Sequence, residues 1–249
     1  MKQQTTLFLD LQNDKRIAYQ KSEGDGPGVL FFGGFKSDMT GTKAVAIEQW
    51  CQTHHRAFVR FDYSGHGQSS GSFESGTIGE WLSDALAVLD ELTEGPQILI
   101  GSSMGGWLSL LATIARPQRV HALMTLACAT DFTQRLLMPM FSQEQKQQLI
   151  EGGSVLIPCD YDDKTPYPIT QNLIEEGQQH MLLDGPIPIR CPVRLFHGMQ
   201  DPDVPWDFSR KTCERLESHD ATLTLIKQGD HRLSEPAHLQ LILNSLSQL

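Results

Sequence analysis

The sequence predicts an α/β protein with a mostly parallel central sheet, flanking helices and a small helical insertion. Short apolar runs alternate along the chain with segments whose apolar residues recur at helical spacing, which is the pattern of parallel strands joined by helices. Residues 131–188 break this alternation, because they are rich in Gln, Pro and Met and show helical patterns only. We therefore expect a core of residues 1–130 and 189–249, interrupted by an insertion over 131–188.

The strands of the core are expected at the short apolar runs over residues 29–32, 57–61, 97–100, 120–126, 193–197 and 222–226. Its helices are expected over residues 42–53, 77–92, 106–115 and 235–249. The second of these helices illustrates the basis, since Ile78, Trp81, Ala85 and Leu89 recur at helical spacing and form one apolar stripe.

The insertion carries two helical patterns, around residues 142–151 and 169–180, with no strand expected between them. Ligands of α/β sheets bind outside the carboxyl ends of the strands, so we expect the insertion to form a cap over that edge. Its apolar residues either line an acyl pocket or pack the cap on the core: Leu136, Leu137, Met138, Met140 and Phe141. An irregular excursion without a functional role is the alternative.

Composition argues against several functional classes. The formal net charge of −10 disfavours nucleic acid and anionic membrane surfaces as partners. No apolar run approaches the length of a membrane span, so no stable membrane association is expected. The five cysteines are scattered, odd in number and without CxxC spacing, which favours reduced thiols. The first residues resemble neither a secretory signal nor an Arg-rich transit segment, so a cytoplasmic location is expected.

The run Gly101-Ser102-Ser103-Met104-Gly105 is the most informative motif of the chain. It lies between an expected strand and an expected helix, which is the context of a nucleophile elbow. Such a turn needs glycine on both sides, because neighbouring backbone comes too close for a Cβ atom. The elbow would present Ser103 as a nucleophile, and the N–H of Met104 would face the oxyanion that forms on the substrate. An ordinary Gly/Ser turn is the alternative.

A serine nucleophile needs a base, and the base needs an orienting acid. In the chain order serine, acid, histidine, two later turns supply candidates. His231 follows the last expected strand and is the candidate base, while Asp201 follows the preceding strand and is the candidate acid. Asp203 competes with Asp201 for the acid role. His66 lies in a loop from which it could also approach the site.

The second oxyanion donor is expected in the turn Gly33-Gly34-Phe35, directly after the first expected strand, with the N–H of Phe35 as the candidate. A plain Gly-Gly turn is the alternative. Metal-ligand spacing such as HExxH does not occur in the sequence, so no metal is expected. The chemistry of a serine nucleophile also needs no cofactor.

These motifs make the chain similar to the α/β-hydrolase superfamily over nearly its whole length. More narrowly, it resembles mitochondrial palmitoyl-protein thioesterases, also described as mycophenolic acid acyl-glucuronide esterases. Segments outside the motifs carry this narrower resemblance, among them Gly41-Thr42-Lys43-Ala44, Arg60-Phe61-Asp62-Tyr63-Ser64-Gly65 and Cys191-Pro192-Val193-Arg194-Leu195. The resemblance implies Ser103 as nucleophile, Asp201 as acid and His231 as base.

The expected function is a serine hydrolase that cleaves carboxylic esters or thioesters through an acyl-enzyme on Ser103. Its substrates would be small-molecule or acyl-protein esters and thioesters, and its oligomeric state is left open. Two alternatives remain. One is another reaction of the same fold, such as lactone or C–C bond hydrolysis, and the other is a non-catalytic ligand-binding protein on this scaffold.

Overall fold

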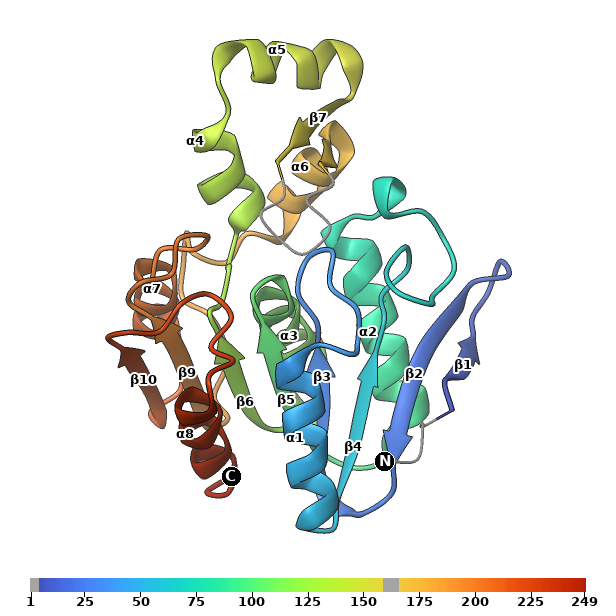
Figure 1. The fold of residues 1–249 in the computed structure, drawn as a ribbon, viewed down its shortest axis with the longest axis vertical. Coiled ribbons are helices and arrows are strands. Elements are labelled where there is room, and N and C mark those ends of the chain that lie inside the picture. The colour runs from blue at the N-terminus through green and yellow to red at the C-terminus, as the bar shows by residue number, and fades with distance from the viewer. Residues whose placement is uncertain (1–4, 159–165) are drawn as a thin grey trace.

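The computed structural model describes residues 5–158 and 166–249. An eight-stranded sheet forms its centre (Figure 1). In spatial order its strands are β1 (Leu7–Asp10), β2 (Arg16–Ser22), β4 (Arg56–Phe61), β3 (Asp25–Phe32), β5 (Gln97–Ser102), β6 (Val120–Leu126), β9 (Val193–Gly198) and β10 (Ala221–Ile226). Pairing is parallel from β4 to β10 and antiparallel between β1 and β2 and between β2 and β4. The predicted fold class is therefore confirmed.

Helices cover both faces of the sheet (Figure 1). One face is covered by α1 (Thr42–Thr53) and α8 (Pro236–Leu246), and the other by α2 (Ile78–Leu92), α3 (Met104–Ala115) and α7 (Asp207–Arg215). Short 3₁₀ turns, η1 (Phe73–Ser75) and η2 (Pro117–Arg119), lie in the connections. No helix among the residues that the structure describes is long and apolar enough to cross a membrane.

Alternating side chains along β3 divide the core into two parts. Val29 and Phe31 pack with α1 and α8, whereas Leu30 and Phe32 pack with α2 and α3. This is the two-residue period of a strand that is buried on both faces. It explains why the strand reads as one uninterrupted apolar run in the sequence.

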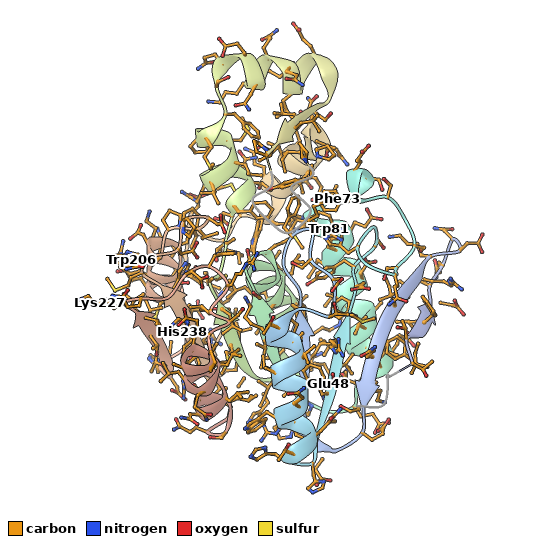
Figure 2. The ribbon with its side chains drawn as sticks, in the orientation of Figure 1. Glu48, Phe73, Trp81, Trp206, Lys227 and His238 are labelled. Atoms are coloured by element: carbon orange, nitrogen blue, oxygen red, sulfur yellow. The ribbon has the colours of Figure 1, made fainter. Side chains whose placement is uncertain are left out.

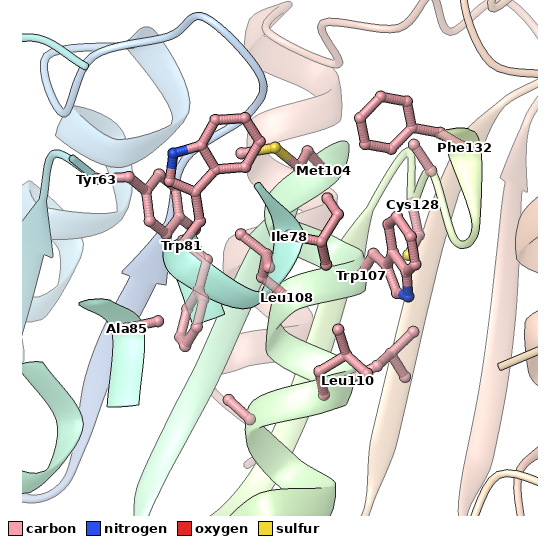
Figure 3. Packing of buried hydrophobic residues seen from close by; sticks show 14 of the residues in the cluster. Tyr63, Ile78, Trp81, Ala85, Met104, Trp107, Leu108, Leu110, Cys128 and Phe132 are labelled. Carbon is pink, nitrogen blue, oxygen red and sulfur yellow. The ribbon is translucent and has the colours of Figure 1, made fainter. Parts of the chain in front are cut away.

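The larger part of the core lies under the start of α3. Trp81, Met104, Trp107 and Phe132 belong to one buried cluster there (Figure 3). Each of the four side chains is at most 5% exposed. Because Met104 is the first residue of α3, this packing fixes the beginning of the helix in place.

The antiparallel pair β1 and β2 was not among the expected strands. Three of the four residues of β1 are exposed, so the strand lacks the apolar run by which the other strands were found. Its partner β2 alternates less regularly, with Ile17 and Ala18 both buried. β1 is the edge strand of the sheet, and its sequence signal is weak because one side of it faces solvent.

The chain between β6 and β9 leaves the sheet and forms a segment of its own (Figure 1). It contains a π-helical turn η3 (Thr133–Leu137), α4 (Met138–Met140), α5 (Gln143–Gly152), β7 (Ser154–Ile157), β8 (Tyr167–Thr170), α6 (Gln171–Gly177) and η4 (Gln178–His180). The expectation that this segment is helical only is wrong, since β7 and β8 pair as an antiparallel hairpin. Both strands are only four residues long, which is the lower limit of length at which alternation can be recognised. Cys159 lies outside the described residues.

Both ends of this segment are tied to the core. The buried carboxylate of Asp131 accepts hydrogen bonds from the N–H groups of Leu182 and Leu183, each at 2.8 Å. It thereby joins the outgoing chain to the returning chain. Further along, the indole N–H of Trp107 on α3 donates to the carbonyl oxygen of His180 at 3.2 Å.

Candidate active site

The turn between β5 and α3 has the geometry of a nucleophile elbow. Ser103 has φ 56° and ψ −119°, a conformation that residues other than glycine rarely adopt. A Cβ atom on Gly101 would lie 2.2 Å from the carbonyl oxygen of Gly105, and one on Gly105 would lie 2.3 Å from that of Phe32. Both glycines are therefore required by close backbone contacts. Ser102 is buried at the end of β5, whereas Ser103 is partly exposed.

The structure brings the three predicted residues together from the ends of three strands. His231, after β10, places Nε2 3.0 Å from Oγ of Ser103. Its Nδ1 lies 2.7 Å from Oδ2 of Asp201, which follows β9. Both contacts are within hydrogen-bonding distance, and they run in one line from hydroxyl through imidazole to carboxylate.

Asp201 is held as an anion. Its Oδ1 accepts the backbone N–H groups of Asp203 (2.9 Å) and Val204 (2.8 Å), while Oδ2 is shared by His231 and by Nε2 of His197 at 3.1 Å. Burial alone would raise the pKa of Asp201, but the hydrogen bonds from the two histidines outweigh it and hold that pKa well below its usual range. Asp203, the competing candidate, is exposed to solvent.

His197, on β9, is a second histidine in contact with Asp201. The side chain is fully buried, and its Nδ1 lies 2.7 Å from Oγ of Ser209 on α7. Because Nε2 faces both Asp201 and the carbonyl oxygen of Val204, the network assigns the proton to that nitrogen. The carboxylate of Asp201 is thus fixed by two histidines rather than one.

Lys43 on α1 makes a contact that the sequence did not predict. Its Nζ donates to the carbonyl oxygen of Arg232, directly after His231. Burial lowers the pKa of Lys43 to about 8, although the nearby carboxylates of Asp230 and Asp201 act in the opposite direction. The lysine therefore anchors the loop that carries His231. No local signal could have found a contact between residues so far apart in the sequence.

The turn after β3 passes close to the nucleophile. A Cβ atom on Gly34 would lie 3.5 Å from the Cβ atom of Ser103. Phe35 has no partner for its N–H among the residues that the structure describes. Met104 is the first residue of α3, where backbone N–H groups have no acceptor within the helix. Two N–H donors are therefore present at the predicted positions.

Asp201, Asp203 and His231 also form the one group of possible metal ligands found within residues 5–158 and 166–249, with ligand atoms within 4.8 Å of one another. The oxygens of Asp201 already accept four hydrogen bonds. Both nitrogens of His231 are likewise engaged, with Ser103 and with Asp201. The chemistry of this donor set fits proton transfer better than metal binding.

The apolar residues predicted in the insertion divide into two groups. Leu137 and Phe141 are buried in the core cluster, and Leu136 and Met138 are partly buried against it. Met140 is 68% exposed, so the expectation that it lines a pocket or packs on the core is wrong. Met140 is the last residue of α4, and the chain leaves the helix at Phe141 in an extended conformation.

A protein with this sheet, elbow and hydrogen-bonded Ser–His–Asp arrangement is a hydrolase of the α/β type. The model of the alpha/beta hydrolase family matches residues 51–240, and the chain belongs to that family. It is 43% identical over 245 residues to the bovine protein named palmitoyl-protein thioesterase ABHD10, mitochondrial. The aligned region covers 97% of this chain and 79% of that protein. The human protein of the same name is 42% identical over 252 residues, covering 100% of this chain and 81% of that protein.

Solved structures agree with this assignment. Mouse alpha/beta hydrolase domain-containing protein 10 superposes with a TM-score of 0.91 at 41% identity, over 98% of this chain and 97% of that one. The chain is therefore an enzyme that hydrolyses esters or thioesters, as its sequence predicted. The alternative of a non-catalytic binding protein is not supported.

The predicted cytoplasmic location is contradicted, because the bovine and human relatives are both named as mitochondrial. The prediction rested on scattered cysteines and on the composition of the first residues. Unpaired thiols indicate a reducing compartment, but they do not distinguish one reducing compartment from another. Targeting is read from segments outside the folded core, so the fold itself holds no information on location.

Proposed function

We propose that Ser103 is the nucleophile, His231 the general base and Asp201 the residue that orients the base. The observation that carries this proposal is the contact of 3.0 Å between Ser103 Oγ and His231 Nε2, continued by that of 2.7 Å between His231 Nδ1 and Asp201 Oδ2. Neutral imidazole takes the hydroxyl proton as Oγ attacks the acyl carbon, and Asp201 stabilises the imidazolium that forms. Water, activated by the same imidazole, then releases the acid from the acyl-enzyme.

The N–H groups of Phe35 and Met104 hold the oxyanion in this proposal. Support comes from the Gly34 backbone, which passes close to Ser103, and from the N–H of Phe35, the next residue, which has no partner among the described residues. The Met104 N–H stands at the first turn of α3, where the helix dipole favours negative charge. Both donors are main-chain groups, so they keep their positions while charge develops on the substrate oxygen.

Residues 131–188 act as a cap that takes part in binding the acyl group. The aromatic ring of Phe35 is 5.6 Å from the ring of Phe132 and 5.6 Å from that of Tyr167, centroid to centroid. Both partners belong to the segment between β6 and β9. An acyl chain that leaves the oxyanion site past Phe35 therefore meets side chains of the cap as well as of the core.

The proposed substrates are fatty-acyl thioesters on proteins, together with smaller esters and thioesters. The protein-bound thioester follows from the names of the bovine and human relatives. The wider range follows from the mechanism, because oxoesters and thioesters form the same tetrahedral oxygen, which the two N–H groups recognise.

A matched series of p-nitrophenyl esters and acyl thiols, from butyryl to palmitoyl, tests this proposal. We expect turnover of both kinds by the wild type and none above background by Ser103→Ala, while Ser102→Ala serves as the matched control. A S-palmitoylated peptide is the decisive substrate for the thioesterase assignment. Turnover of oxoesters alone would leave a general esterase, and cleavage of lactones alone would favour the alternative reaction of this fold.

A further inference from the structure

His66 lies in the loop that follows β4, and both of its ring nitrogens are occupied. Its Nδ1 is 3.2 Å from the carbonyl oxygen of Ser64, so the network assigns the proton to Nδ1. Its Nε2 then accepts a hydrogen bond from the backbone N–H of Lys36 at 3.2 Å. The imidazole is 4% exposed, and burial lowers the pKa of His66 to about 4, so the ring stays neutral at ordinary pH.

Lys36 follows Phe35 directly, so this hydrogen bond acts on the turn after β3, residues 33–39, which we call the oxyanion turn. The backbone of Lys36 has φ 56°, a left-handed conformation that a lysine adopts only when its surroundings hold it. The peptide plane that carries the Lys36 N–H meets the plane that carries the Phe35 N–H at the Cα atom of Phe35, so rotation of the first plane would remove a restraint on the second. The acceptor on His66 opposes that rotation.

The rings of His66 and Phe35 are fixed by the same two partners. The centroid of His66 is 5.2 Å from that of Phe73 and 5.2 Å from that of Trp81. The centroid of Phe35 is 4.9 Å from that of Phe73 and 5.8 Å from that of Trp81. Trp81 also donates its indole N–H to the carbonyl oxygen of Ser64 at 3.1 Å. Figure 2 shows Phe73 and Trp81 together at the upper end of α2.

The same loop holds the oxyanion turn at a second point. Oδ1 of Asp62 accepts the N–H of Met39 at 2.6 Å, and Oδ2 accepts the N–H of Gln68 at 2.8 Å. Asp62 thus fixes the far end of the turn, while His66 fixes the residue next to the proposed donor. The imidazole of His66 is therefore the side chain placed to set the direction of the Phe35 amide.

We propose that His66 is a positioning residue of the oxyanion hole, acting through the Lys36 N–H. This inference rests on the proposed function, because it assumes that the Phe35 N–H binds the oxyanion. His66 itself does not touch the substrate and takes no part in proton transfer. His66 does lie near the proposed oxyanion donor, as its place in the loop led us to expect, and the role that we propose for it is indirect.

Two substitutions separate the hydrogen bonds of His66. Asn places a polar atom near the position of Nδ1 and keeps the contact with Ser64, but it has no acceptor at the position of Nε2. Gln reaches the position of Nε2 with its carbonyl oxygen and keeps an acceptor for the Lys36 N–H. The matched control is His238→Asn, because His238 is also a buried histidine, 6% exposed, but lies on α8 (Figure 2).

The readout is kcat/KM for p-nitrophenyl butyrate, measured beside the inhibition constant of a butyl trifluoromethyl ketone, whose adduct with Ser103 carries an oxyanion. For His66→Asn we expect kcat/KM to fall about 10- to 100-fold, less than the loss of a whole oxyanion donor, and the inhibition constant to rise by about the same factor. KM should change by no more than about threefold. His66→Gln and His238→Asn should stay within about threefold of the wild type.

Equal losses in His66→Asn and His66→Gln, or a fall in kcat/KM without weaker ketone binding, would overturn the inference. If His66→Asn does not fold, a measurement on the wild type still tests the inference. Nitrogen NMR of histidine-labelled protein at about pH 6 should report Nε2 of His66 as unprotonated, and a protonated Nε2 would contradict the assignment. Absence of fluorophosphonate-sensitive hydrolysis in the wild type would instead refute the proposed function, so the two failures are distinguishable.

Discussion

Replacing Asp201 by asparagine exchanges one carboxylate oxygen for an NH₂ group at the most heavily hydrogen-bonded side chain of the site. Four N–H donors face that carboxylate, two from histidines at Oδ2 and two from the backbone at Oδ1. The backbone donors of Asp203 and Val204 cannot change, so the amide oxygen must face them. The NH₂ group then faces His231.

His231 can meet an NH₂ group only by accepting at Nδ1, which moves its proton to Nε2. An imidazole that is protonated at Nε2 cannot take the proton of Ser103. In serine proteases this wrong tautomer costs about 10⁴ in kcat, which corresponds to about 5 kcal/mol of barrier. We expect a loss of that order in Asp201→Asn, together with a lower melting temperature, because the NH₂ group would also face the protonated Nε2 of His197.

The assay is kcat for p-nitrophenyl butyrate at about pH 7.5. Asp203→Asn is the matched control, since Asp203 is exposed and its contact with Asp201 uses the backbone N–H. That variant should keep kcat within about threefold. An Asp201→Asn variant that keeps more than about a tenth of the wild-type kcat would contradict this role of Asp201, and so would a larger loss in Asp203→Asn than in Asp201→Asn.

Three further outcomes can be checked. Ser103→Ala should lose fluorophosphonate labelling while Ser102→Ala keeps it, and labelling that persists in Ser103→Ala would exclude this nucleophile. Gly105→Ala should lower the free energy of unfolding in urea by about 1–3 kcal/mol, because its Cβ atom would lie 2.3 Å from backbone oxygen, whereas Gly152→Ala, with nothing closer than 3.9 Å, should not. Because burial lowers the pKa of His66 to about 4, against roughly 6.5 in the unfolded chain, its share of stability is full above the higher value and is lost as pH falls to the lower one. Urea titrations at neutral and acid pH should therefore show a larger acid loss for the wild type than for His66→Gln, and equal losses would contradict a buried neutral imidazole.

The features that could be predicted from the sequence are those whose residues lie close together along the chain. The elbow occupies one run of five residues, and the strand before it and the helix after it are both buried, so their patterns are strong. His231 and Asp201 could be chosen because each directly follows an apolar strand near the end of the chain. The spacing Gly-x-x-Asp-x-x-Val-Pro favours Asp201 over Asp203 in the sequence, and the structure adds the contact of Asp201 with His231.

The features that were missed depend on distant contacts or on weak patterns. Lys43 meets Arg232 across 189 positions, and His66 meets Lys36 across 30, so neither contact leaves a local signal. The edge strand β1 is largely exposed, and the hairpin of β7 and β8 consists of strands only four residues long. In both cases tertiary pairing, rather than a local apolar pattern, makes the strand.

The single carboxylate of Asp131 closes the neck of the segment between β6 and β9, by binding Leu182 and Leu183 on the returning chain. A loop whose two ends are held together can grow, shrink or be replaced at little cost in chain entropy, and without moving any strand of the sheet. Substitutions, insertions and deletions can therefore accumulate in this one continuous segment while the proposed catalytic residues keep their positions. For protein engineering, the contact of Asp131 with Leu182 and Leu183 marks the two positions between which a segment from another hydrolase could be inserted to alter the acyl group accepted.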